Sequence, residues 1–278
     1  AALFTIVSAQ DYTLNNLLDG SLSARGVRPM ESSPDGLHYY QMNPESTVVV
    51  KFEYATGKAV DTLFNTATAR ECRFDTFQGF MVSADENRVI VYRNKEQIYR
   101  RSFKADYYYY DVRRNLVRKL SQNNSKQMAP VFSPDGKMLA YVCDNDIWLS
   151  KFDFDTESQV TKDGELNKII NGATDWVYEE EFGTTRLMEF SPDNKLLAFV
   201  RTDESQVKEF QFQTYHQQLY PDFYTFKYPK AGEKNAEVTL NVFDIDSRTI
   251  RKMDLPLDAD GYIPKITFTA NEQELVAM

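Results

Sequence analysis

Three consecutive carboxylates stand out among the residues whose types could do chemistry. They are Glu179, Glu180 and Glu181, and they follow the sequence Asp-Trp-Val-Tyr at 175–178. Adjacent like charges repel one another, so a run of this kind is usually a solvated acidic loop. Two of the carboxylates could instead converge on a cation, because an ammonium group has three donors that carboxylate oxygens can accept. Composition alone leaves both interpretations open.

No pattern in this chain supplies a catalytic centre. It has no Gly-x-Ser-x-Gly nucleophile motif, no zinc-type Cys/His cluster, no phosphate-binding glycine loop and no calcium loop. The two histidines, His38 and His216, lack metal-ligand spacing and are interpreted as structural or surface residues. Two cysteines, Cys72 and Cys143, do not make a disulfide framework, and free buried thiols are favoured over a pair.

The elements that must position the glutamates are organised by an internal repeat. Five turn-like copies of a Ser-Pro-Asp-Gly pattern occur at 32–36, 82–86, 132–137, 190–195 and 268–272. The third residue of each copy lies at 34, 84, 134, 192 and 270, so the steps are 50, 50, 58 and 78 residues. The pattern favours a turn, because Pro fixes φ, Asp bonds its own backbone and Gly tolerates positive φ.

The repeats predict an all-β fold. Each turn leads into an apolar run, such as 138–142 or 196–200, that is typical of a strand buried on both faces. A second strand is expected at 147–152, after the polar turn at 144–146. Four strands in about 50 residues are typical of one blade of a β-propeller. We therefore expect a β-propeller of four-stranded blades, with about four and a half blades in this chain.

Composition agrees with this fold and excludes one class of partner. The chain has 278 residues, 14% of them aromatic and only 11 of them glycine, which suits pleated sheets. With 32 Lys and Arg against 41 Asp and Glu, the formal charge is −9. A negative protein repels phosphate backbones, so we expect no nucleic-acid partner.

Two repeat steps exceed 50 residues, and the excess is interpreted as inserted material. The 58-residue step adds about eight residues near 171–183, where the three glutamates lie. The 78-residue step adds about 28 residues within 203–237. Within that window, residues 208–228 alternate between apolar and polar and are expected to form a long hairpin arm, whose apolar side could fold back on the propeller. Insertions in repeat proteins often form the binding face.

The first residues predict export. Residues 1–9 form a short apolar run that ends in Val-Ser-Ala before Gln10, as in the tail of a secretory signal peptide. The alternative is an apolar first strand. No later stretch approaches the roughly 18 apolar residues that span a bilayer. We expect an exported protein, either periplasmic or extracellular.

The motif at 175–181 resembles the double-glutamate motif of the dipeptidyl peptidase IV family, a group of prolyl oligopeptidase-type serine peptidases. Three further landmarks, at 99–103, 139–147 and 228–232, are similar to that family in the same order. The resemblance covers nearly all of the chain from Tyr12 onward and indicates a bacterial homologue. A seven-residue motif in register with three landmarks favours the binding interpretation of the acidic run over the solvated loop.

The resemblance implies an eight-bladed propeller that caps an α/β-hydrolase domain. Residues 10–278 would be the N-terminal part of the propeller, and the catalytic domain would lie beyond Met278, so this chain alone is expected to be inactive. In the family, the last two glutamates of the motif grip the free α-amino group of the peptide, which gives this role to Glu180 and Glu181. An arginine after an aromatic residue contacts a substrate carbonyl, and the matching position is Arg100. No role is carried over to Thr184, and no cofactor or metal is implied.

The implied activity is release of N-terminal dipeptides, X-Pro or X-Ala, from peptides with a free N-terminus. A homodimer through the arm at 208–228 is also implied. One alternative is a prolyl tripeptidyl peptidase of the same architecture, although the adjacent glutamate pair favours dipeptide release. The other alternative is a non-catalytic periplasmic propeller scaffold. A downstream Gly-x-Ser-x-Gly motif followed by Asp and His would distinguish the peptidases from the scaffold.

Overall fold

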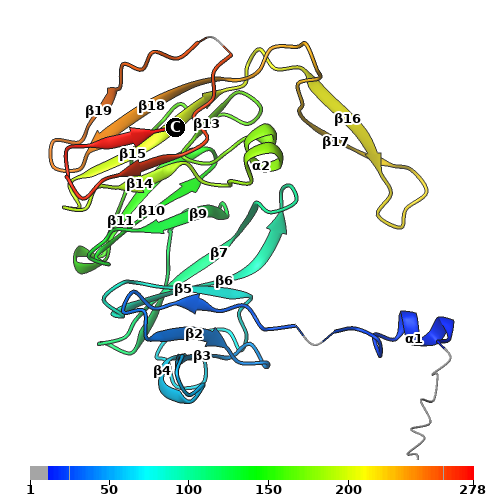
Figure 1. The fold of residues 1–278 in the computed structure, drawn as a ribbon, viewed down its shortest axis with the longest axis vertical. Coiled ribbons are helices and arrows are strands. Elements are labelled where there is room, and N and C mark those ends of the chain that lie inside the picture. Colours follow the sequence, from blue (N-terminus) through cyan, green and yellow to red (C-terminus); the bar gives the residue numbers. More distant parts are fainter. Residues whose placement is uncertain (1–11, 25, 259) are drawn as a thin grey trace, which may run out of the picture.

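Antiparallel β-sheets make up most of the computed structural model, which describes residues 12–24, 26–258 and 260–278 (Figure 1). The sheets follow one another along the chain and stack from β2–β4 at one end of the molecule to β18–β19 at the other (Figure 1). The segment interpreted as a signal-peptide tail, residues 1–9, lies outside the described residues. Within the described residues, neither α1 (Leu14–Leu18) nor α2 (Trp176–Phe182) is long enough to cross a membrane.

The first two sheets are four-stranded and have their strands in chain order. The strands of the first are β1 (Glu31–Ser32), β2 (His38–Met42), β3 (Val48–Glu53) and β4 (Ala59–Asn65). The strands of the second are β5 (Gly79–Val82), β6 (Arg88–Gln97), β7 (Phe103–Asp111) and β8 (Leu116–Lys119). β6 and β7 are the long strands of this set, and their hairpin ends at residues 98–102.

The third sheet follows the same plan, whereas the fourth has five strands. The strands of the third are β9 (Gln127–Phe132), β10 (Met138–Cys143), β11 (Asp146–Lys151) and β12 (Thr156–Gln159), with a 3-10 turn at Phe152–Phe154. The strands of the fourth are β13 (Ile169–Asn171), β14 (Met188–Phe190), β15 (Leu196–Asp203), β18 (Glu237–Asp244) and β19 (Thr249–Lys252). β13 and β14 both pair with β15, and α2 lies between them in the chain. A single pair, Ala105 with Gln127, joins the second sheet to the third.

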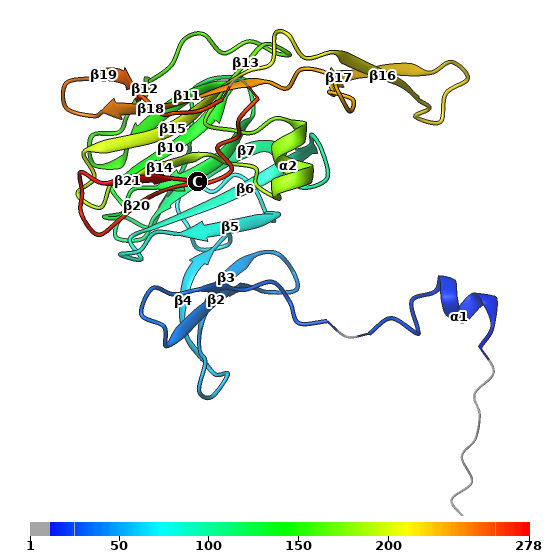
Figure 2. The same ribbon diagram turned by 45° about the horizontal axis from the view of Figure 1, so that its top comes forward.

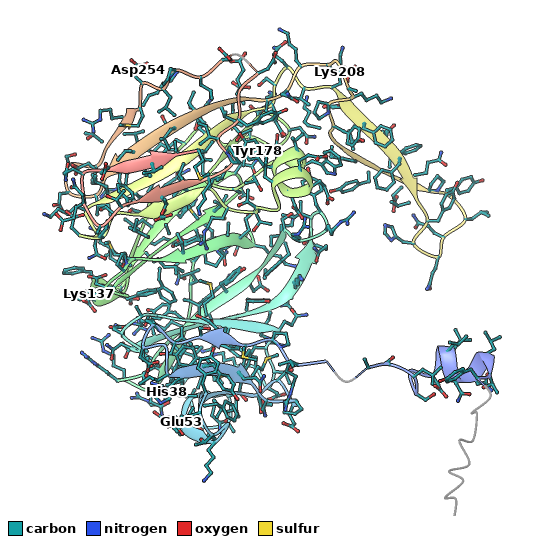
Figure 3. The ribbon with its side chains drawn as sticks, viewed as in Figure 1. His38, Glu53, Lys137, Tyr178, Lys208 and Asp254 are labelled. Carbon is teal, nitrogen blue, oxygen red and sulfur yellow. The ribbon has the colours of Figure 1, made fainter. Side chains whose placement is uncertain are left out.

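Two hairpins complete the described structure. β16 (Glu209–Thr214) and β17 (Asp222–Lys227) pair only with each other and form an arm that extends away from the sheets (Figure 2). β20 (Ile266–Phe268) and β21 (Leu275–Ala277) form the last hairpin beside β14. In Figure 3, Lys208 marks the point where the arm leaves the fourth sheet.

Three of the five repeated turns are held by the same hydrogen-bond pattern. In the third copy, the Ser133 hydroxyl donates to Asp135 Oδ1 at 2.7 Å and accepts from the Met138 amide at 2.9 Å. The second copy at Ser83 and the fourth at Ser191 make the same two bonds. Such side-chain to backbone bonds satisfy donors that the tight turn would otherwise leave unpaired. The pattern explains why the serine and the aspartate recur at fixed spacing.

The hydrophobic core lies between neighbouring sheets rather than within them. Leu139 and Tyr141 of β10 belong to a cluster with Ile90 of β6. Ala140 and Val142, the alternate residues of the same strand, belong to the cluster shared with β14 and β15. All five side chains are fully buried. Because side chains alternate across a strand, β10 contributes to the core on both faces of its sheet.

The predicted all-β propeller architecture is therefore confirmed. Each of the five turn copies lies in a hairpin of two consecutive strands, namely β1–β2, β5–β6, β9–β10, β14–β15 and β20–β21. The apolar runs at 138–142 and 196–200 lie in β10 and β15 and are almost wholly buried, as predicted. An eight-bladed closed ring stays a prediction.

Candidate functional site

The acidic run lies on the short helix α2, which has a defined beginning and end. The Asp175 carboxylate caps the N-terminus by accepting from the Tyr178 amide at 3.0 Å. Gly183 ends the helix at φ 68°, a left-handed conformation that glycine adopts without strain. Tyr178 is 2% exposed, and its hydroxyl accepts from the Ile263 amide at 2.8 Å. The helix is therefore fixed to the segment before β20, and Figure 3 shows Tyr178 on it.

The three glutamates of α2 have three different environments. An α-helix turns about 100° per residue, so consecutive side chains point in different directions. Glu179 is 0% exposed, the Glu180 side chain is 18% exposed, and Glu181 is exposed. The repulsion between adjacent carboxylates is reduced by this divergence. Neither of the two open interpretations, a solvated loop or a convergent cluster, predicts that one glutamate is wholly buried.

Glu179 faces the end of the β6–β7 hairpin. Its Oε1 accepts from two consecutive backbone amides, those of Arg101 and Ser102, the latter at 2.9 Å. The Arg101 guanidinium also donates to the Glu179 carbonyl oxygen at 2.9 Å. These bonds join α2 to a segment that lies about 78 residues earlier in the chain.

Arg100 and Glu180, both candidate binding residues, meet at this junction. Arg100 Nε lies 3.3 Å from Glu180 Oε2, and the arginine side chain is 72% exposed. Glu181 is on the next position of α2 and forms no ion pair with any residue in the described ranges. An exposed arginine fork and two carboxylates on one short helix make a site that can hold an amino group and a carbonyl oxygen.

Aromatic side chains pack around the base of the arm and connect it to this site. The Trp176 and Tyr228 rings are 4.3 Å apart between centroids, and the Tyr99 and Phe226 rings are 5.8 Å apart. The Tyr224 hydroxyl donates to the Ile98 carbonyl at 3.1 Å. Arm, helix and hairpin end therefore form one packed unit at the edge of the molecule where α2 lies (Figure 1).

Buried ionisable groups lie close to α2 and have raised pKa values. Burial, together with the nearby charge of Asp175, raises the pKa of the Glu204 carboxyl to about 7, although Lys227 lowers it. Burial also raises the pKa of Asp175, against the effect of its backbone hydrogen bonds. For Tyr99, burial and then the neighbouring Glu204 raise the pKa of the phenol.

The hairpin end at 98–102 separates two cavities. One, of about 450 Å³, is lined on this side by Arg101, Ser102, Thr184 and Arg186. The other, of about 630 Å³, is lined by Ser102 and by residues of the arm and of the 164–167 loop. Thr184, to which no role was carried over, lines the first cavity. Within the described residues, no three His, Cys, Asp or Glu side chains lie close enough to hold a metal ion.

The remaining candidate residues have ordinary surroundings. His38 Nδ1 lies 2.6 Å from Asp35 Oδ2, beside a repeat turn, and His216 lies in the exposed end of the arm. Cys72 and Cys143 are both free, and burial raises the pKa of the Cys143 thiol to about 11. Neither cysteine is a reactive thiolate at neutral pH.

Comparisons with known proteins agree with the sequence resemblance. The family model of the dipeptidyl peptidase IV N-terminal region matches residues 83–278. The crystal structure of Porphyromonas gingivalis dipeptidyl peptidase 4 is 52% identical to this chain, with a TM-score of 0.94 over 98% of this chain and 39% of that chain. Probable dipeptidyl-aminopeptidase B of Talaromyces marneffei is 35% identical over 212 residues, which are 70% of this chain and 23% of that protein.

A human relative matches over most of the chain. Prolyl endopeptidase FAP of Homo sapiens is 28% identical over 268 residues, 94% of this chain and 34% of that protein. The chain thus spans between 23% and 39% of the length of these three proteins. The similar proteins are all peptidases by name, and each is much longer than the part that matches.

Proposed function

The chain belongs to the family of dipeptidyl peptidase IV N-terminal regions, and we propose that it is the substrate-binding propeller portion of a serine exopeptidase that releases N-terminal dipeptides. The observation that carries the proposal is the meeting of Arg100 with Glu180 at 3.3 Å, next to Glu181, from two distant segments of the chain. The proposal also covers export of the protein and a homodimer through the arm. The preference for X-Pro or X-Ala rests on family membership.

The chemistry of the three residues fits a peptide N-terminus. An α-ammonium group has three donors, and the carboxylates of Glu180 and Glu181 offer acceptors for all of them. The permanently charged guanidinium of Arg100 offers donors to the first carbonyl oxygen of the same peptide. Arg100 Nε lies 3.3 Å from Glu180 Oε2, so an amino group bound by Glu180 would lie close to the arginine.

A clamp of this kind works as a ruler. A free N-terminus held at a fixed distance from a serine nucleophile brings only one peptide bond into attack geometry, and the bond two residues along yields dipeptides. The serine would come from an α/β-hydrolase domain of the same protein. The clamp contributes binding and orientation, and the hydrolase domain contributes the covalent chemistry.

Replacement of Glu181 tests the proposal. Glu181→Ala in the full-length enzyme should lower kcat/KM on a dipeptide-chromophore substrate by more than tenfold, because it removes one of the two carboxylates that would accept from the α-ammonium group. Glu272→Ala is the matched control, because Glu272 is an exposed glutamate in the β20–β21 turn, and it should leave activity unchanged. Activity of Glu181→Ala within twofold of wild type would contradict the proposal.

Product analysis separates the competing functions. Mass spectrometry of a peptide digested by the full-length protein should show release of its first two residues. Release of tripeptides would select the tripeptidyl peptidase instead, and the adjacent pair Glu180 and Glu181 is the observation that favours the dipeptide. No cleavage of any peptide with a free N-terminus would favour the scaffold.

A further inference from the structure

Glu179 is a wholly buried acid next to the clamp, and the proposed function gives it no task. We propose that Glu179 is a positioning residue whose carboxylate fixes the backbone that carries Arg100, so that the arginine faces the substrate together with Glu180 and Glu181. This inference rests on the proposed function of the clamp. It adds a residue that acts through Arg100 and does not touch the substrate.

The contacts of Glu179 are on the residues that directly follow Arg100. One carboxylate oxygen accepts from the amides of Arg101 and Ser102, and the Glu179 carbonyl accepts from the Arg101 guanidinium. Arg100 itself reaches α2 by a single ion pair from a side chain that is 72% exposed, and exposed pairs of this kind hold a side chain weakly. The buried hydrogen bonds of Glu179 therefore fix the backbone position from which the Arg100 side chain extends.

The sheet gives only limited support to the segment that carries Arg100. The β6–β7 ladder ends at the pair of Gln97 with Phe103, and one backbone bond, from the Ile98 amide to the Ser102 carbonyl at 2.9 Å, closes the hairpin. The Gln97 side chain of β6 also donates to the Tyr99 carbonyl at 2.6 Å and to the Ser102 carbonyl at 3.1 Å, but neither bond involves Arg100. A loop of this length has many conformations that satisfy such a closure. Two charge-assisted bonds from a buried carboxylate select one of them.

Stability alone does not explain a carboxylate at this position. Glu179 Oε2 and Ser102 Oγ are both buried, and neither has a hydrogen-bond partner among the described residues. Burial of a carboxylate costs free energy unless its oxygens are hydrogen-bonded, and a complete buried ion pair can often be replaced by apolar residues of similar volume without loss of stability. A half-satisfied buried carboxylate is therefore explained better by what it holds, the Arg100 segment, than by a contribution to the fold.

Kinetics of the full-length peptidase test the proposal, with Ala-Pro-p-nitroanilide as substrate. The variants are Glu179→Leu, Glu179→Gln, Arg100→Ala and Glu179→Leu combined with Arg100→Ala. Glu179→Leu should lower kcat/KM at least tenfold, with the same division between kcat and KM as Arg100→Ala. Glu179→Gln keeps one acceptor oxygen and should retain more activity than Glu179→Leu. In the Arg100→Ala background, Glu179→Leu should lower kcat/KM by less than threefold, because the guanidinium that Glu179 positions is already absent.

Glu189→Leu is the matched control. Glu189 Oε1 also accepts a backbone amide, that of Phe268 at 3.2 Å, and the Thr267 hydroxyl at 3.0 Å, but it joins β14 to β20 away from Arg100. It should leave kcat/KM within threefold of wild type. Hydrogen exchange of the peptide that contains residues 98–102 should become faster in Glu179→Leu and unchanged in Glu189→Leu.

Three results overturn the inference. The first is activity of Glu179→Leu within twofold of wild type. The second is an equal fold loss of kcat/KM on Glu179→Leu substitution in the wild-type and Arg100→Ala backgrounds. The third is an unchanged rate of hydrogen exchange at residues 98–102 in Glu179→Leu. If Glu179→Leu does not fold, the same cycle with Glu179→Gln decides by the same criteria. The Glu181→Ala variant distinguishes failure of the proposed function from failure of this inference. Full activity of Glu181→Ala would contradict the proposed clamp. Loss of activity in Glu181→Ala together with full activity of Glu179→Leu would contradict only the role of Glu179.

Discussion

Glu204 lies on the arm side of the hairpin end at 98–102, and it is 4% exposed. Burial raises the pKa of its carboxyl from the usual 4.5 to about 7. Between these two values the folded protein binds more protons than the unfolded chain, so the free energy of unfolding falls as the pH rises through this window. Above pH 7 the full cost of the buried charge is present.

Glu204→Gln removes this ionisation and should change the pH dependence of stability. We expect the variant to be more stable than wild type at pH 8, by up to roughly 3 kcal/mol, and this difference should shrink toward pH 5. Denaturant unfolding of both proteins at several pH values measures it. Glu165→Gln, at a largely exposed glutamate, is the control and should follow wild type. Parallel pH curves for Glu204→Gln and wild type would contradict the assigned cause.

The sequence predicted which residues belong to the candidate site only where a recognisable motif contains them. The resemblance assigned Arg100 to the same site as Glu180, and the two side chains do lie within 3.3 Å of each other. The sequence could not distinguish Glu179 from its neighbours, since three adjacent glutamates look alike until a helix turns them apart. Glu179 is buried by its contact with the β6–β7 hairpin, and the sequence around residue 179 does not predict that contact.

The turns and strands were the most predictable elements. In three of the five copies a Ser and an Asp at fixed spacing close the hairpin by bonds within six residues, as Ser133 and Asp135 do with Met138. Such local chemistry needs no tertiary information. The helix α2 was missed, because its seven residues lie in a window interpreted as an insertion loop and its stability depends on the Asp175 cap and on the buried Tyr178.

The arm carries a group of exposed apolar side chains. Its β16–β17 hairpin and end loop carry exposed aromatic and aliphatic side chains, among them Phe212, Tyr215, Leu219, Tyr220 and Phe223. Exposed apolar groups gathered on one hairpin favour a protein interface. At its base, the Tyr228 amide donates to the Lys208 carbonyl at 2.9 Å, so the two ends of the arm are already adjacent.

We expect the arm to hold a homodimer together. Replacement of residues 209–227 by a two-residue turn should convert the full-length protein from a dimer to a monomer in size-exclusion chromatography with light scattering. Because Phe226 at the arm base packs near α2, a second variant with Leu219→Glu and Tyr220→Glu charges only the end loop, where both side chains are over three-quarters exposed. A dimer that survives the deletion would refute this role of the arm.

At the scale of the whole molecule, the candidate site is built across sheets. Arg100 comes from the second sheet and Glu180 from an insertion in the fourth. The third sheet lies between them, and β10 packs on both neighbours through alternate residues. The repeat period of 50 residues predicted this succession of sheets, but not which ends of the hairpins would meet. Which hairpin ends meet depends on the lengths of β6 and β7 and on the position of α2 in the chain. Strand lengths and inserted elements differ from sheet to sheet, so the repeat period does not predict them.

The site should therefore depend on core packing far from it. Leu139 is 0% exposed and belongs to the cluster that joins the second and third sheets, so Leu139→Ala should lower the free energy of unfolding by about 2–5 kcal/mol. Leu166→Ala, at a side chain that is 80% exposed, should change it by less than about 0.5 kcal/mol. Denaturant unfolding of the full-length protein measures both.

Activity provides the second measurement for the same pair of variants. If the second and fourth sheets hold Arg100 and Glu180 in register only through the third, Leu139→Ala should raise KM for a dipeptide substrate several-fold under conditions where the variant is still folded. Leu166→Ala should leave KM unchanged. An unchanged KM in a destabilised but folded Leu139→Ala enzyme would mean that the Glu179 and Arg100 contacts hold the clamp together without help from the core between the sheets.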